Sequence, residues 1–76
     1  MTKRVKPTEA EFVVLGDEVK HIPTGAIWSA YPGHREASHY RPVMLGSVLP
    51  NGDDYRPDEV EVIALHLLAN RPGVKG

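Results

Sequence analysis

The stretch WSAYPGHREASHYRP, residues 28–42, concentrates the side chains of this chain that are best suited to recognising a ligand. It holds the single Trp, two of the three Tyr, two of the four His and two Arg. Aromatic rings and Arg side chains are enriched at protein interfaces, and they also stack on the bases of single-stranded nucleic acids. The stretch therefore marks the candidate recognition surface.

Residues 33–42 are predicted to form an exposed connection after a strand that carries Trp28. The segment contains Gly33 and Pro42 and shows no sustained hydrophobic period. Trp28 is the largest core candidate, so the expected partner-binding residues lie after it. They are His34, Arg35, His39, Tyr40 and Arg41. The alternative is that this loop only covers one end of a sheet.

A nucleic-acid surface is the competing interpretation of the same region. A basic N-terminal segment could add phosphate contacts whose strength depends on salt. The residues involved would be Lys3, Arg4, Lys6, Tyr31, Arg35, Tyr40 and Arg41. The net charge of −1 argues against a general attraction to polyanions. Nucleic acid is therefore the alternative, and a protein partner of unknown identity is the expectation.

No spacing in the sequence indicates a metal site, a cofactor or catalytic residues. His34 and His39 are five residues apart, whereas ligands on one face lie three or four apart on a helix and two apart on a strand. The chain contains no G-x-S-x-G elbow and no glycine-rich phosphate loop. The absence of cysteine excludes disulfides and thiolate zinc sites. We therefore expect a protein that is not an enzyme and that binds no metal or cofactor.

Two hairpins are predicted to position these residues. Residues 11–15 and 18–22 are β-favouring runs around Gly16-Asp17, and the turn between them has two or three residues. Ile22-Pro23-Thr24-Gly25-Ala26 is typical of a three-residue loop with a glycine bulge. That loop would pair Lys20 with Trp28 and place both on the core face. Residues 43–49 around Gly46 are the candidate fourth strand.

Residues 57–70 are predicted to form one helix that ends before Pro72-Gly73. Pro57 suits the first helical position, and acidic residues follow in the first turn. At about 100° per residue, one apolar stripe with Leu67 at its centre should dock on the sheet. It comprises Val60, Ile63, Ala64, Leu67 and Leu68.

A second helical stripe has no expected partner within the chain. It comprises Val62, Leu65 and Ala69, and we treat it as the candidate self-association face of a homodimer.

The chain as a whole is predicted to be an α+β domain, with an antiparallel meander of three to four strands packed against one C-terminal α-helix. Residues 9–72 form this domain, between a flexible basic arm at 1–8 and a flexible tail at 73–76. The N-terminus lacks the apolar segment of a signal peptide, and VIALHLLA at 62–69 is too short to span a bilayer. We expect a cytoplasmic regulator, inhibitor or accessory factor without membrane contact.

Overall fold

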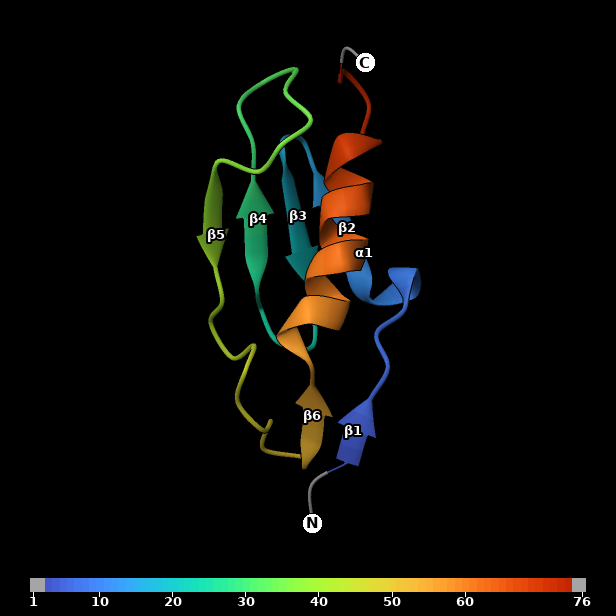
Figure 1. The fold of residues 1–76 in the computed structure, drawn as a ribbon, viewed down its shortest axis with the longest axis vertical. Helices are drawn as coiled ribbons and strands as arrows, with labels where there is room; N and C mark the ends of the chain where they lie inside the picture. The colour runs from blue at the N-terminus through green and yellow to red at the C-terminus, as the bar shows by residue number, and fades with distance from the viewer. Residues whose placement is uncertain (1–2, 75–76) are drawn as a thin grey trace.

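The computed structural model describes residues 3–74 and contains a four-stranded antiparallel sheet with one helix across it (Figure 1). The predicted α+β meander with a single C-terminal helix is therefore confirmed. Residues 1–2 of the expected arm and residues 75–76 of the expected tail lie outside the described residues. The strands of the sheet, in spatial order, are β2 (Phe12–Leu15), β3 (Glu18–His21), β4 (Ile27–Ser29) and β5 (His39–Arg41), and the helix is α1 (Pro57–Ala69).

A second, two-stranded sheet lies at the opposite end of the molecule from the loop between β4 and β5 (Figure 1). Strand β1 (Lys3–Val5) pairs in parallel with β6 (Asp53–Tyr55), which sets Lys3 opposite Asp53 and Arg4 opposite Asp54. A 3₁₀ turn, η1 (Glu9–Glu11), then leads into β2. The segment that we expected to be a flexible arm thus includes a strand, in which basic residues lie beside acidic ones.

The first hairpin has the shorter of its two expected turns. Leu15 lies opposite Glu18, so the loop is the pair Gly16-Asp17. Gly16 adopts a φ of 61°, a conformation that glycine reaches without a steric penalty.

The second hairpin differs from the prediction by one residue. Val19, and not Lys20, lies opposite Trp28, and the His21 amide donates a 2.8 Å hydrogen bond to the Ala26 carbonyl. The loop therefore has four residues, 22–25. Because side chains alternate along a strand, this shift of one residue in register moves the side chains of β3 to the opposite faces of the sheet. The predicted core position of Lys20 is wrong, and Val19 and His21 are buried instead, whereas the predicted core position of Trp28 is confirmed.

The predicted fourth strand at 43–49 is also wrong, because the fourth strand comes from the segment expected to be a loop. Strand β5 covers His39–Arg41, and the chain leaves the sheet at Pro42, which has no amide proton to donate. Val43 then adopts a φ of 50°, and Gly46 one of 95°, within a series of turns. Leu45 and Leu49 from these turns are buried in the core.

The hydrophobic core lies between α1 and the inner face of the sheet. The helix follows its prediction to within one residue at the C-terminal end, and Val60, Ala64 and Leu68 are fully buried. Leu67, which we expected at the centre of the docking stripe, is only partly buried. Helix α1 packs mainly on β3, with fewer contacts to β4 and β2. Within residues 3–74, the structure has no helix with the length and apolar character needed to cross a membrane.

Arg71 attaches the end of α1 to two loops. Its guanidinium group donates to the Asp17 carboxylate at 2.9 and 3.1 Å and to the carbonyls of Tyr31, His34 and Leu68 at 2.7 to 3.1 Å. The side chain is almost fully buried, so these bonds satisfy a charge that would otherwise be costly to bury. Arg71 therefore fixes the start of the loop between β4 and β5 against the helix.

We predict that Leu68→Ala lowers the free energy of unfolding by about 2–5 kcal/mol, because it removes a fully buried side chain from a tightly packed core. Leu67→Ala should cost clearly less, since Leu67 retains solvent contact. Urea denaturation of both variants measures the difference. Equal losses would contradict this assignment of the docking face.

Candidate functional site

A groove lies between α1 and β5, and we call it the α1–β5 groove. One helix is about 10 Å across and strands are spaced about 4.8 Å apart, so α1 covers the centre of the sheet and leaves β5 uncovered. The resulting space has a volume of about 600 Å³. Its lining residues are Trp28, Arg35, Glu36, Ala37, Tyr40, Glu61, Leu65 and Ala69.

The floor of the groove is a stacked pair of aromatic rings. Trp28 and Tyr40 are directly opposite on β4 and β5, with ring centroids 5.0 Å apart and an interplanar angle of 25°. Trp28 is only 2% exposed, whereas Tyr40 is 45% exposed. Burial, followed by the nearby Glu61 carboxylate, raises the pKa of the Tyr40 hydroxyl. Tyr40 therefore presents a neutral ring and a hydroxyl that keeps its proton at neutral pH.

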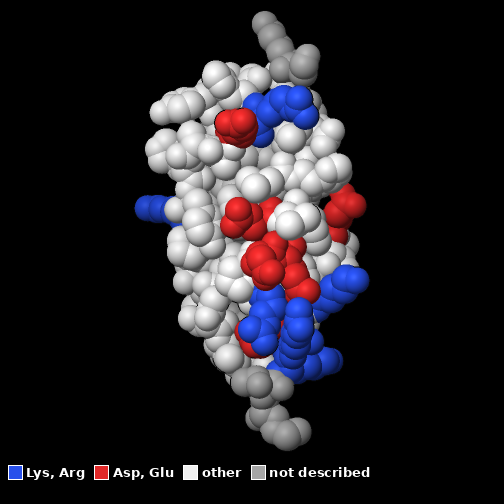
Figure 2. Space-filling view, viewed as in Figure 1, with Lys and Arg blue, Asp and Glu red and all other residues white. Residues whose placement is uncertain are grey.

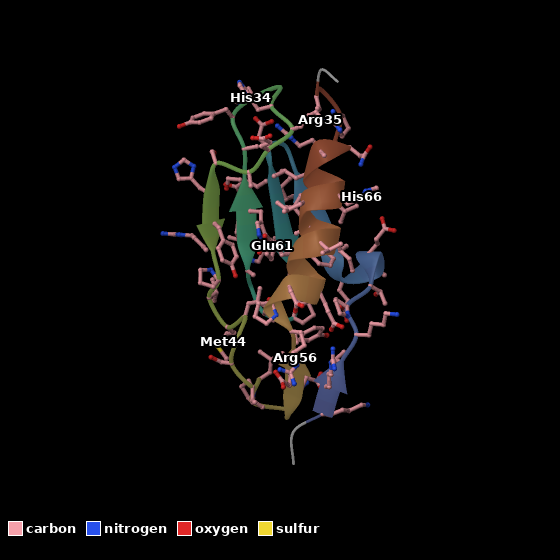
Figure 3. The ribbon with its side chains drawn as sticks, viewed as in Figure 1. His34, Arg35, Met44, Arg56, Glu61 and His66 are labelled. Carbon is pink, nitrogen blue, oxygen red and sulfur yellow. The ribbon has the colours of Figure 1, made fainter. Side chains whose placement is uncertain are left out.

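Charged side chains lie at both ends of the groove, and its one basic side chain, Arg35, is at the end opposite Glu61. Figure 3 shows Arg35 near the C-terminal end of α1, and Glu61 nearer the middle of the helix. Neither Arg35 nor Glu61 has a charged partner within residues 3–74. The ion pairs in this part of the chain are Arg4 with Glu59, His21 with Glu11 and Arg71 with Asp17. Glu36 lines the groove beside Arg35. The groove thus combines an apolar floor with charges that are free to meet a ligand.

The predicted partner-binding residues separate onto different surfaces. Arg35 and Tyr40 line the groove. His39 and Arg41 alternate with Tyr40 on β5, opposite Ser29 and Ile27, so they belong to the outer face of the sheet. The His34 ring packs against Tyr31, with centroids 6.1 Å apart, at the end of the sheet.

Sequence reasoning missed four residues that line the groove, namely Trp28, Glu36, Ala37 and Glu61. Trp28 was assigned to the core alone, yet it also forms part of the floor. Glu61 precedes Leu65 by four residues and Ala69 by eight, so helical spacing alone puts the three on one side of α1. That spacing is the signal that could have identified Glu61.

The predicted self-association residues lie on the groove and beside it. Leu65 and Ala69 form the helical wall, and Leu65 is 36% exposed. Val62 is 70% exposed and lines a separate depression with Lys6 and Pro7. The stripe is therefore divided: Leu65 and Ala69 face the groove, whereas Val62 faces the separate depression.

The candidate nucleic-acid residues do not form one surface. Lys3 and Arg4 are on β1, at the other end of a molecule 44 Å long from the loop that carries Arg35 (Figure 1). The Arg4 guanidinium also pairs with the Glu59 carboxylate at 2.9 Å. Figure 2 shows acidic side chains over the start of α1 directly beside basic side chains over β6 and β1. The basic segment is thus compensated within the molecule.

A buried polar cluster around His21 is a second feature that the sequence did not reveal. His21 is fully buried, and its ring lies 4.7 Å from those of both Phe12 and Tyr55. Its Nε2 is 3.2 Å from Glu11 Oε1, and its Nδ1 is 2.7 Å from Thr24 Oγ1. Because an ionised carboxylate only accepts hydrogen bonds, Nε2 carries the proton and Nδ1 accepts from the Thr24 hydroxyl. The cluster contains no solvent-accessible imidazole, so we assign it a structural role.

The pKa values of the cluster follow from burial and hydrogen bonding. Burial lowers the pKa of His21, and the Glu11 carboxylate offsets this in part. Burial acts to raise the pKa of Glu11, but hydrogen bonds, the largest from Tyr55 and His21, lower it overall. Burial and the bond to Glu11 raise the pKa of Tyr55 to about 12. Since Tyr55 is on β6 and Glu11 precedes β2, these bonds join the two sheets.

No protein-family model, curated protein or solved structure matches this chain.

We predict that acid destabilises the protein through His21. Its folded-state pKa is below 6.5, so as the pH falls below that value the unfolded chain binds more protons than the folded chain, and the free energy of unfolding decreases. Glu11 continues this loss below pH 4.5, because its pKa is also lowered in the folded state. Urea denaturation at about pH 7.5 and about pH 5 measures the loss of stability that is due to His21. These pH values lie about one unit or more on either side of the ordinary histidine pKa.

The matched variants are His21→Gln, which retains hydrogen-bonding groups, and His34→Gln at an exposed histidine. The loss of stability between these pH values should shrink in His21→Gln and persist in His34→Gln. An unchanged pH dependence in His21→Gln would refute the assignment.

Proposed function

We propose that this protein is a small non-enzymatic binding module that contacts a protein partner through the α1–β5 groove. One observation carries the proposal: beside the uncovered strand β5, a stacked aromatic floor lies between charges that have no partner within residues 3–74. An apolar centre with a charged rim is the usual composition of a protein interface.

The dimensions of the groove suit side chains from a protein segment. Its volume of about 600 Å³ falls in the range of ligand-binding clefts, and it is partly open to solvent. Apolar side chains would displace water from the Tyr40 ring and Leu65. Arg35 at one end and Glu61 at the other would then set the direction of the bound segment.

The groove is held in shape before any partner binds. Arg71 fixes the loop that carries Arg35 by bonds to the Tyr31 and His34 carbonyls at 3.1 and 2.7 Å. The Trp28 ring holds Tyr40 in place by stacking. A preorganised site loses less conformational entropy on binding, which supports a role in recognition.

Protein contact is favoured over nucleic-acid binding by the distribution of charge. Single-stranded nucleic acids are bound by aromatic and basic side chains along one continuous surface. Here the exposed aromatic ring of Tyr40 lies near Glu61, and the basic residues of β1 lie beside acidic residues of β6. We place this activity in the cytoplasm, since a chain without cysteine suits a reducing compartment.

The proposal is tested by selecting, from a random peptide display library, the peptides that bind to the immobilised protein. A selected peptide without Trp should change the fluorescence of Trp28, which is the single Trp of the chain and lies in the groove. Leu65→Gln should weaken binding about tenfold or more, because burial of a leucine side chain contributes about 1.5–3 kcal/mol.

The matched control is Leu15→Gln, which replaces another exposed leucine, on β2 and on the outer face of the sheet. It should leave peptide binding unchanged. If no selected peptide affects Trp28, or if both variants weaken binding equally, the groove is not the contact surface for a peptide segment of a separate protein.

A further inference from the structure

We infer that the α1–β5 groove is self-complementary and takes a second copy of this chain about a two-fold axis. This inference rests on the proposed function, because it names the protein partner of the same groove. Its basis is the order of charged and apolar side chains along α1.

Glu61, Leu65 and Ala69 occupy successive turns on one side of the helix. With a rise of about 1.5 Å per residue, Glu61 and Ala69 lie about 6 Å on either side of Leu65 along the axis. Arg35 is near the C-terminal end of α1, which is the Ala69 side of Leu65 (Figure 3). Arg35, with Glu36 beside it, and Glu61 therefore lie on opposite sides of Leu65.

A two-fold axis through Leu65, perpendicular to the helix, exchanges these two ends. It brings Glu61 of the partner subunit to Arg35, and by symmetry Glu61 to the partner subunit's Arg35. A two-fold interface uses the same patch twice, so it requires this self-complementarity. The two helices run antiparallel in this arrangement, which also opposes their dipoles favourably.

Shape agrees with charge in this arrangement. Val62 and Leu65, three residues apart on α1, form an exposed apolar ridge on the helix, with exposed fractions of 70% and 36%. Leu65 lines the groove, and Val62 lines the separate depression. Leu65 would pack against the partner subunit's Leu65 on the axis, so that the two antiparallel helices face each other beside both grooves. The symmetric contact thus buries apolar side chains that are exposed in the single chain.

The expected dimer is reversible and depends on protein concentration. Glu36 lies beside Arg35 and opposes the incoming carboxylate, so it subtracts from the attraction. A standard interface buries about 800 Å² per partner, which is about a sixth of the 5022 Å² that this chain exposes. Mass should therefore rise with concentration and fall with added salt.

The test exchanges the charges at the two ends of the groove. Sedimentation velocity from micromolar to millimolar concentration should show wild-type mass rising from 8.4 kDa towards twice that value. Arg35→Glu and Glu61→Arg should each remain monomeric, because each places like charges opposite one another across the two-fold axis. An equimolar mixture of the two variants should dimerise, since both contacts then pair Glu with Arg.

The mixture also controls for folding, because two misfolded variants would not restore a defined dimer. Arg41→Glu, on the outer face of β5, is the matched control and should dimerise like the wild type. Wild-type protein that stays monomeric at millimolar concentration overturns the inference, as does a mixture that stays monomeric. Either result leaves the proposed function standing if selected peptides still bind in the groove. If the peptide test fails but the dimer forms as expected, only the binding of peptide segments in the groove is overturned.

Discussion

The width of a single helix is the constraint on which the rest of this structure depends. One helix cannot cover four strands, so α1 packs over β3 and its neighbours and leaves β5 at an open edge. The apolar side chains beneath the helix form the core. The side chains beside it line a groove, because β5 still pairs with β4 and brings Tyr40 onto Trp28. The candidate site thus exists because one helix covers only part of the four-stranded sheet.

Buried polar side chains keep this small domain in one arrangement. Arg71 donates hydrogen bonds to the turn between β2 and β3, to the loop after β4 and to its own helix. His21 and Glu11 connect β3 to the 3₁₀ turn, and Tyr55 extends that connection to β6. A chain of this length buries limited apolar surface, so such fully bonded groups define which loops meet. Of these groups, Arg71 joins the two walls of the groove, because it bonds to α1 and to the loop that carries Arg35.

Two local predictions failed where side-chain partners outweighed local propensity. The turn 22–25 is compatible with a loop of three or four residues, and the longer loop places His21 where it reaches Thr24 and Glu11. Residues 39–41 have little hydrophobic character, but the Tyr40 ring stacks on the Trp28 ring when this segment joins the sheet. Neither partner is visible from neighbouring residues in the sequence, because each contact depends on a strand register that is set elsewhere in the fold.

The sequence by itself determined the helix, its two apolar stripes, the presence of both hairpins though not the register of the second, and the core position of Trp28. These features depend on turn residues, helix-end residues and periodicity, which act over a few neighbouring positions. The tertiary structure alone decided that Arg35 and Glu61, which are 26 residues apart, would line one groove. It also decided that the basic residues of β1 would lie beside the acidic residues of β6. Such pairings follow from how the elements pack, since charges carry no information about their distant neighbours until the core has brought them together.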